Sequence, residues 1–101
     1  MHMRSGVSRM QQERVRPSLA VRASVSGDGL ILLDVDGGLV LSSNAVGARI
    51  WQLLEQQRTT REIAQRLVEE YAVPVERALH DVQAFVADLM ARGLVAGDPP
   101  R

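Results

Sequence analysis

The pattern of apolar and polar residues in the first half of the chain predicts three β-strands. "LAVRASV" (19–25) alternates apolar and polar positions, which is typical of a half-buried strand. "LILLDV" (30–35) is a continuous apolar run of strand length, and such runs indicate a strand that is covered on both faces or central in its sheet. "DGG" (36–38) favours a tight hairpin because Asp-Gly tolerates positive φ, and "LVL" (39–41) then pairs back as a brief third strand. The alternating apolar positions of the first strand are Leu19, Val21, Ala23 and Val25.

From residue 43 onward, apolar residues recur every three or four positions, and this period predicts helices. Ser43 or Asn44 is suited to cap the first helix, because a short polar side chain can accept a hydrogen bond from the first turn. Gly47 lies inside that helix and would let another backbone approach closely. Thr59, with Glu62 three residues later, forms a capping box and starts the second helix.

Pro74 ends the second helix and is expected as the first residue of a third, which runs to residue 92. Gly93 stops that helix, and Leu94 is placed to fold back in a Schellman-type contact. The order β-β-β-α-α-α predicts an α+β domain with helices on one face of a three-stranded antiparallel sheet. Two short helices, a longer helix and a small hairpin sheet are winged-helix-like.

The polar ends of the chain are expected to lie outside this domain. Residues 1–17 carry four arginines and one acid and predict a flexible arm, or a basic arm that orders on an acidic partner. The folded domain is expected over residues 18–95, and residues 96–101 form a frayed tail.

Composition narrows the class of protein. The chain has 101 residues, enough for one domain, and no cysteine, so disulfides and thiolate metal sites are excluded. Twelve arginines balance twelve acids, which argues against nucleic acid as the main partner. The sequence has neither a run of ~20 apolar residues for a membrane span nor the apolar stretch of a secretory signal. We therefore expect a cytoplasmic protein without membrane contact.

Residues able to do chemistry are isolated from one another. His80 has no second histidine or thiol nearby in the helix pattern, so a metal site is not expected. Ser42 and Ser43 lack evident His and Asp partners for a triad. The glycines flank strands and do not open a helix with phosphate-binding spacing. We expect a protein that is not an enzyme and that needs no cofactor.

A winged-helix outline also raises the alternative of a DNA-binding protein. Such a fold needs a helix with basic and amide side chains on its outer face. The second and third predicted helices mix arginines with acids, so neither is a basic reading surface.

Over residues 29–95 the chain resembles the PqqD family, the small recognition elements for precursor peptides. The matching stretches are "NAVGARIWQLL", "RTTREIAQRL" and "DVQAFVADLMARGLV". "GARIW" is similar to the leader-binding proteins of lasso-peptide pathways, and "DVDGG" stands where true PQQ members usually carry "PE". Lasso-type members often have an aromatic residue in the third strand, where Leu39 or Val40 stands, and a leucine where Ser43 stands.

This resemblance implies a site for the leader segment of a ribosomally made precursor peptide. The leader would add as a strand to the open edge of the third strand, and its apolar side chains would enter a groove beside the third helix. The implied edge residues are Leu39, Val40, Leu41 and Ser42. The implied apolar wall comprises Val75, Ala78, Leu79 and Val82, with Arg77 and Asp81 for polar contacts. For each apolar residue, plain core packing is the competing interpretation.

We therefore expect a non-catalytic protein that presents a precursor to a leader peptidase or another modifying enzyme. A DNA-binding protein and a scaffold that forms a homodimer through the open sheet edge are the alternatives. A proline at Leu41 is expected to abolish peptide binding by removing an edge donor.

Overall fold

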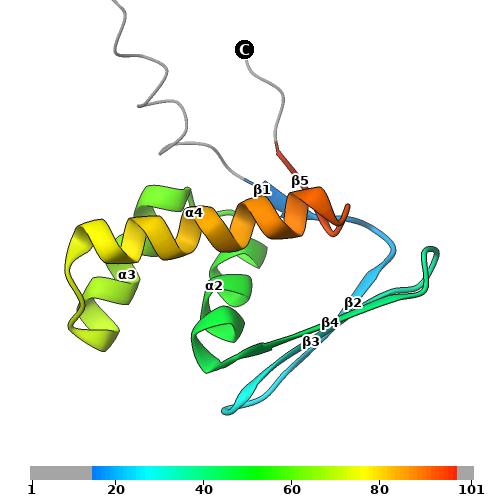
Figure 1. Ribbon diagram of the computed structural model, residues 1–101, viewed down its shortest axis with the longest axis horizontal. Coiled ribbons are helices and arrows are strands. Elements are labelled where there is room, and N and C mark those ends of the chain that lie inside the picture. The colour runs from blue at the N-terminus through cyan, green and yellow to red at the C-terminus, as the bar shows by residue number, and fades with distance from the viewer. Residues whose placement is uncertain (1–14, 98–101) are drawn as a thin grey trace, which may run out of the picture.

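Two antiparallel sheets and three helices make up residues 15–97, the part of the chain that the computed structural model describes (Figure 1). The elements are β1 (Val15–Pro17), β2 (Val21–Val25), β3 (Gly29–Asp34), β4 (Leu39–Asn44), α2 (Ala45–Glu55), α3 (Thr60–Tyr71), α4 (Val75–Ala91) and β5 (Val95–Gly97). The predicted α+β class is confirmed: a three-stranded antiparallel sheet, β2-β3-β4, is followed by three helices. Winged-helix-like describes this arrangement only loosely.

The third strand of this sheet is longer than the sequence suggested. β4 spans six residues instead of three, because pairing with β3 continues through two serines to Asn44. The hairpin turn before it lies where predicted, but the positive φ, 70°, falls on Gly38 and not on Asp36 or Gly37. The Gly38 N–H donates to the carbonyl of Asp34 over 2.8 Å. The Asp34 carboxylate also accepts from the N–H groups of Asp36 and Gly37.

The sheet is covered on one face only. Leu30 and Leu32 of β3 are buried beneath α2, which packs against both β3 and β4. The intervening Ile31 and Leu33 point to the opposite face and are exposed. Of the two expectations for this strand, the central position is confirmed, because β3 lies between β2 and β4. Coverage on both faces is wrong for the described residues, although the inward period of two is kept.

The predicted helix starts are present. The Asn44 side chain caps α2 by accepting from Gly47 N–H over 2.9 Å. Thr59 and Glu62 form the reciprocal capping box of α3, with bonds of 3.1 and 2.8 Å. Pro74 differs from expectation by one position, since it is the N-cap of α4 and not its first residue.

The end of α4 forms the predicted Schellman motif. The Leu94 N–H donates to the carbonyl of Leu89 over 3.0 Å, and the Gly93 N–H donates to that of Met90 over 3.1 Å. Gly93 has φ 74°, and Leu94 is fully buried. The motif reverses the chain and delivers it to β5.

A second, two-stranded sheet joins the two ends of the described chain. β1 and β5 pair antiparallel, with Val15 opposite Gly97 and Pro17 opposite Val95. Val15 is 1% exposed and belongs to the core, so the expected arm ends before it and the expected tail begins after β5. Residues 1–14 and 98–101, where the rest of the arm and tail fall, lie outside the described residues.

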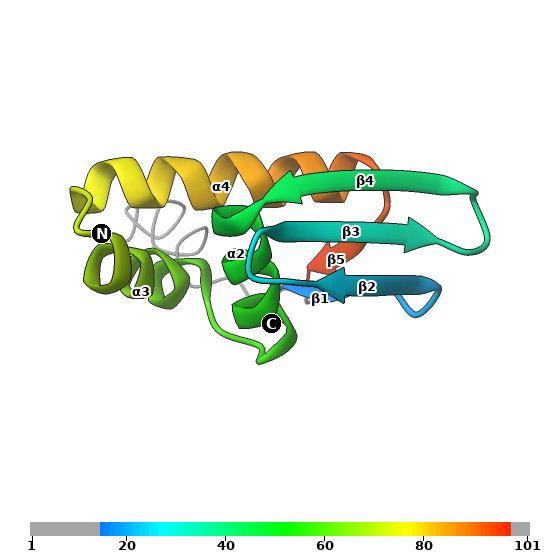
Figure 2. The same ribbon diagram turned by 90° about the horizontal axis from the view of Figure 1, so that it is seen from below.

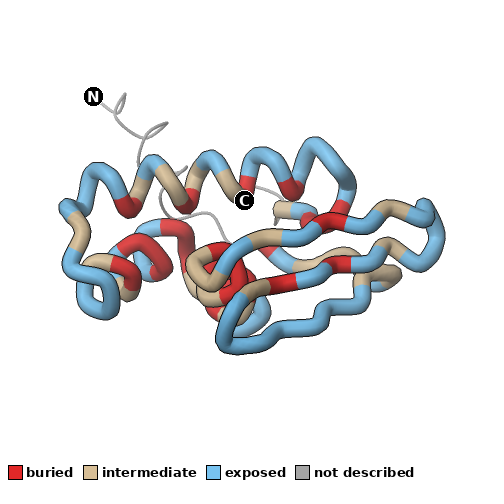
Figure 3. Tube along the Cα trace, turned by 60° about the horizontal axis from the view of Figure 1, so that its bottom comes forward, coloured by how far each residue is buried: buried red, intermediate tan, exposed pale blue. Residues whose placement is uncertain are grey.

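β4 is an edge strand of the three-stranded sheet and lies on the side nearest α4. Figure 2 shows β4 as the edge strand on the α4 side of the sheet, with β2 at the opposite edge. The core gathers where α2 meets the other elements, and Figure 3 shows its buried segments concentrated there. Trp51 of α2 is fully buried, and its indole N–H donates to Glu55 over 2.9 Å.

The β1–β5 pairing predicts different effects for two apolar residues that lie close in sequence. Val15→Ala should lower the free energy of unfolding by about 2 kcal/mol, because it removes buried methyl groups. Leu19→Ala should change it by less than ~0.5 kcal/mol, because Leu19 is 98% exposed in the turn before β2. Urea unfolding measures both. Equal small effects would show that residue 15 belongs to the arm.

Candidate functional site

The backbone of β4 is hydrogen-bonded to the sheet along one side only, and the register shows which residues are free. In an antiparallel pair, successive residues alternate between bonding the partner strand and pointing away from it. The bonds from Val35 N–H to Ala20 and from Ser26 N–H to Gly29 bracket the β2–β3 ladder. These two bonds show that the odd-numbered residues of β3 direct their N–H and C=O groups to β2. The even-numbered residues of β3 therefore direct theirs to β4.

The same alternation identifies the open groups of β4. Leu39, Leu41 and Ser43 lie opposite the even-numbered residues of β3 and bond to them. Val40 and Ser42 therefore direct their N–H and C=O groups to the open edge. The expectation that Leu41 supplies an edge donor is wrong, since its N–H faces Leu32.

This edge lacks the features that usually protect an edge strand. "LVLSSN" contains no charged residue and no proline, and its pairing with β3 is continuous over six residues. A strand added here would lie on the α4 side of the sheet (Figure 2). The edge is thus suited to accept another backbone.

A groove of about 510 Å³ lies beside the end of β4. We call it the β4–α4 groove. One wall comes from the β4–α2 junction: Ser43, Asn44, Val46, Gly47 and Ile50. The other comes from one face of α4, with helical spacing: Arg77, Asp81, Ala84, Phe85 and Asp88.

A smaller apolar pocket of about 290 Å³ continues the groove toward α3. It shares Val46, Arg77 and Asp81 with the groove. Its remaining lining is Leu67, Tyr71, Val73 and Ala78. Together the two hollows offer apolar surface with charged groups at the rim, which is the usual character of a specific binding site.

The two acids of the groove each pair with an arginine four residues away, on α4 or at its C-cap. The Arg77 Nε lies 3.4 Å from an Asp81 oxygen, and the Arg92 Nε lies 3.0 Å from an Asp88 oxygen. Exposed pairs at this helical spacing contribute only about 0.3–0.5 kcal/mol. Arg77 and Asp81 can therefore break their mutual ion pair and bind charged groups of a ligand instead, at little energetic cost.

Gly47 shapes the groove wall by its missing side chain. A Cβ at this position would overlap the Ser43 side chain, with the Ser43 Cβ 2.8 Å away, and would lie 3.4 Å from the Phe85 ring. The expected close approach therefore occurs, but the neighbours are side chains and not backbone. The glycine lets β4, α2 and α4 meet at one corner of the groove.

The four predicted edge residues differ in environment. Val40 and Ser42 are exposed and carry the open backbone groups. Leu41 is buried in the core and Leu39 is partly buried against it. For these two side chains, the structure favours the core-packing interpretation.

The six predicted residues of α4 are spread over several environments. Arg77 and Asp81 line the β4–α4 groove, and Ala78 lines the apolar pocket. Val82 is fully buried in the core. Val75 is exposed and Leu79 partly buried, and neither belongs to the lining of the groove or pocket.

Sequence reasoning missed the residues that form most of the groove. They are Ser43, Asn44, Val46, Gly47, Ile50, Ala84, Phe85 and Asp88. The available signal was the recurrence of Arg77, Asp81, Phe85 and Asp88 at helical spacing, which marks a face of α4 distinct from its core face.

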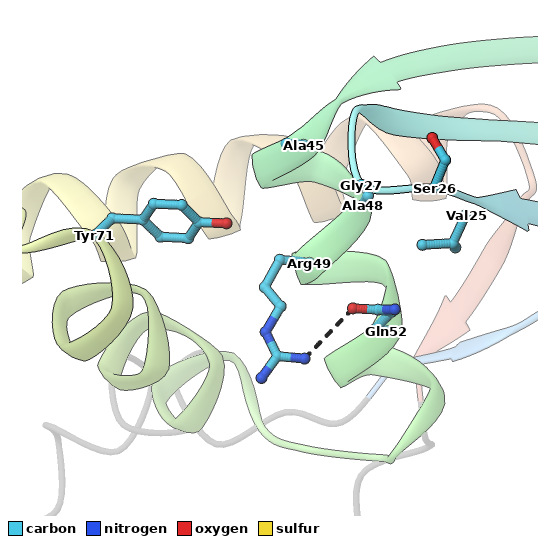
Figure 4. Close-up of a pocket in the computed structure, with 8 residues that line it drawn as sticks. All are labelled: Val25, Ser26, Gly27, Ala45, Ala48, Arg49, Gln52 and Tyr71. Atoms are coloured by element: carbon cyan, nitrogen blue, oxygen red, sulfur yellow. Dashed lines mark hydrogen bonds between the residues drawn. The ribbon is translucent and has the colours of Figure 1, made fainter.

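Another hollow, of about 400 Å³, lies on the side of the β2–β3 turn and holds none of the predicted residues (Figure 4). Arg49 of α2 lies at its wall and binds Glu70 of α3 in a fork, with N–O distances of 2.8 to 3.2 Å. The hydrogen bond from Arg49 lowers the pKa of Glu70, and the hydrogen bond to Glu70 raises the pKa of Arg49. This cation is neutralised within the protein, so the hollow offers little charge to a ligand.

The DNA-binding alternative is not supported. Arginines on the outer faces of the helices are paired with acids, as in Arg66–Glu70 at 3.9 Å and Arg77–Asp81 at 3.4 Å. A reading helix needs unpaired basic groups aimed at the groove of DNA. Neither α3 nor α4 presents such a face.

Residues 15–97, the described part of the chain, contain no group of three or more His, Cys, Asp or Glu side chains that could hold a metal ion. None of their helices is long and apolar enough to cross a membrane.

Comparison with known proteins gives one family and two similar structures. Residues 29–95 match the family model described as coenzyme PQQ synthesis protein D (PqqD). The structure of TbiB1 in complex with the TbiA(beta) leader peptide is similar, with 30% identity and a TM-score of 0.77 over 84% of this chain and 99% of that chain. A lasso peptide synthetase B1 complexed with the leader peptide has 28% identity and a TM-score of 0.73, over 85% of this chain and 99% of that chain. The search of curated proteins found no match.

Because the space around Gly47 is crowded, replacing this glycine with alanine should lower stability, although alanine favours helices more than glycine does. In an open helix, Gly→Ala stabilises by about 1 kcal/mol. Here Gly47→Ala should instead destabilise by about 1–2 kcal/mol, because the new Cβ overlaps Ser43. Thermal unfolding of Gly47→Ala, and of Gly47→Ala with Ser43→Gly, measures this. Stabilisation by the single substitution would contradict the packing described, whereas partial recovery in the double variant supports it.

Proposed function

This chain belongs to the PqqD family, and we propose on that basis that it captures the leader segment of a ribosomally synthesised precursor peptide and presents it to a processing enzyme. The observation that carries the proposal is the uncharged open edge of β4 with the β4–α4 groove beside it. The two similar structures, both complexes with leader peptides, support the same assignment and favour a lasso-peptide type of pathway.

The leader binds by β-strand addition to β4. Its backbone pairs with the open N–H and C=O groups of Val40 and Ser42, which supplies affinity without regard to side chains. Because side chains alternate along a strand, every second leader residue points toward α4. These residues enter the β4–α4 groove and supply the specificity.

The lining of the site indicates which leader side chains fit. The apolar pocket accepts a bulky apolar group, and burying one such side chain contributes about 1.5–3 kcal/mol. Arg77 and Asp81 stand where groove and pocket join. They offer one charge of each sign to polar groups flanking the buried side chain.

The protein contributes binding and positioning, and the chemistry belongs to its partner. The partner is a leader peptidase or another enzyme that modifies the precursor. The chain itself acts without catalysis and without a cofactor. The complex forms in the cytoplasm, where ribosomes release the precursor.

The direct test uses fluorescent peptides that tile the precursor encoded beside this chain. One segment from the leader half should bind with Kd at or below about 10 µM, which corresponds to a binding free energy of roughly 7 kcal/mol, because strand pairing and a buried side chain act together. Peptides from the core half, and a DNA duplex titrated in low and high salt, serve as controls. No binding of any segment at tens of micromolar would refute the proposal.

A proline substitution tests the mode of binding. Ser42→Pro should weaken leader binding at least about tenfold, because it removes an outward N–H donor that pairs with the peptide. Ser42→Ala keeps this donor and should bind as wild type does. Fluorescence anisotropy measures the affinities, and circular dichroism checks that the helices remain folded. Equal affinities for the two variants would exclude pairing at this residue.

A further inference from the structure

Tyr71, the last residue of α3, lines two hollows at once. One is the apolar pocket of about 290 Å³, to which α2 contributes Val46. The other is the hollow of about 400 Å³ to which α2 contributes Ala45 and Arg49, and we call it the Arg49 hollow. Among the residues that the structure describes, Tyr71 alone belongs to both linings. Its side chain therefore separates the two spaces.

The Tyr71 ring is placed as a partition and not as a core residue. Figure 4 shows it reaching from the end of α3 toward α2, with Ala45 and Arg49 on the far side. The residue remains 43% exposed, whereas Leu67, one turn earlier on the same helix, is fully buried. The ring thus faces open space in both hollows, and its volume decides where the apolar pocket ends.

The backbone that carries the ring is fixed on both sides. One residue earlier, Glu70 accepts the forked hydrogen bonds of Arg49, which tie the last turn of α3 to α2. One residue later, Ala72 takes the left-handed conformation at φ 55°, and its N–H donates to the carbonyl of Val68 over 3.0 Å. A ligand side chain in the pocket therefore meets a ring whose helix cannot easily move away.

We propose that Tyr71 determines the size of the leader side chain that the apolar pocket accepts, because its ring closes the pocket on the side of the Arg49 hollow. This inference rests on the proposed function and adds the residue that sets the size limit. The wild-type pocket admits an aliphatic or single-ring side chain and discriminates against the two fused rings of tryptophan.

Removal of the ring joins the pocket to the Arg49 hollow. The lining of that hollow combines the small apolar residues Ala45 and Ala48 with the polar groups of Gln52 and Ser26. A tryptophan side chain has a matching character, since its large apolar body carries one N–H donor. The enlarged site should therefore favour tryptophan over leucine.

The experiment uses the leader segment that binds the wild-type protein. Replacing each of its apolar residues by alanine identifies the anchor, the position at which this change weakens binding most. The anchor is then made leucine or tryptophan, and fluorescence anisotropy gives the ratio of the two Kd values. This ratio is insensitive to a general loss of affinity, which changes both values alike.

Four variants are compared with the wild-type protein. Tyr71→Ala removes the partition, and Tyr71→Phe keeps the ring. Ala45→Leu fills part of the Arg49 hollow, because Ala45 lines that hollow and not the apolar pocket. The fourth variant combines Tyr71→Ala with Ala45→Leu and completes a double-mutant cycle. Circular dichroism checks folding, and Tyr71→Leu, which keeps a good helix former, replaces Tyr71→Ala if the latter unfolds.

The wild-type protein should bind the leucine peptide more tightly than the tryptophan peptide. Tyr71→Ala should shift the ratio toward tryptophan by at least about tenfold, since small differences in side-chain size within an apolar pocket change affinity by about 10–200-fold. Tyr71→Phe should keep the wild-type ratio. Ala45→Leu should leave the ratio unchanged while Tyr71 is present and should cancel most of the shift in the combined variant.

Three results overturn the proposal. The first is a wild-type protein that binds the tryptophan peptide at least as tightly as the leucine peptide. The second is an unchanged ratio after removal of the Tyr71 ring, even if both affinities fall, which would give the ring a structural role only. The third is a shift that persists with Ala45→Leu, because the larger side chain would then not enter the Arg49 hollow. Failure of every leader segment to bind the wild-type protein is a failure of the proposed function instead.

Discussion

The N–H and C=O groups of each β4 residue point either toward β3 or toward the open edge of the sheet. Only those that point toward β3 have hydrogen-bond partners within the sheet. Leu39, Leu41 and Ser43 are bonded within the sheet, whereas Val40 and Ser42 face outward. No charge or proline in the strand discourages another chain from pairing with them. The groove beside β4 and the likeness to two structures solved with leader peptides are both explained by peptide binding at this unpaired edge.

The remainder of the fold holds that edge in place and gives it a neighbour. The Asn44 cap ends β4 and begins α2 in a single residue, so the strand is anchored to the helix that fills the core. Gly47 allows Phe85 of α4 to approach the same corner. At the other end of α4, the Schellman motif sends the chain into β5, which pairs with β1 and packs Val15 into the core. These contacts set the orientation of α4 and therefore the shape of the groove.

The parts of the fold that rest on local hydrogen bonds could be predicted from the sequence. The caps at Asn44 and Thr59 and the stop at Gly93 each involve residues within a few positions of one another. The pairing of β1 with β5 joins residues some eighty positions apart, and three-residue strands show no period that would reveal it. The groove residues were missed for a related reason. Which face of α4 meets β4 depends on how three helices pack, so Val82 was expected in the site and lies in the core, while Phe85 was overlooked.

Hydrogen exchange of individual amides, measured by NMR with and without the leader peptide, tests the central claim most directly. In the free protein the Leu41 amide is bonded to β3 and should exchange slowly, while the amides of Val40 and Ser42 exchange fast. Saturation with the leader should slow the Val40 and Ser42 amides by at least about tenfold and leave that of Leu41 little changed. Leader binding that leaves Val40 and Ser42 in fast exchange would contradict strand addition at β4.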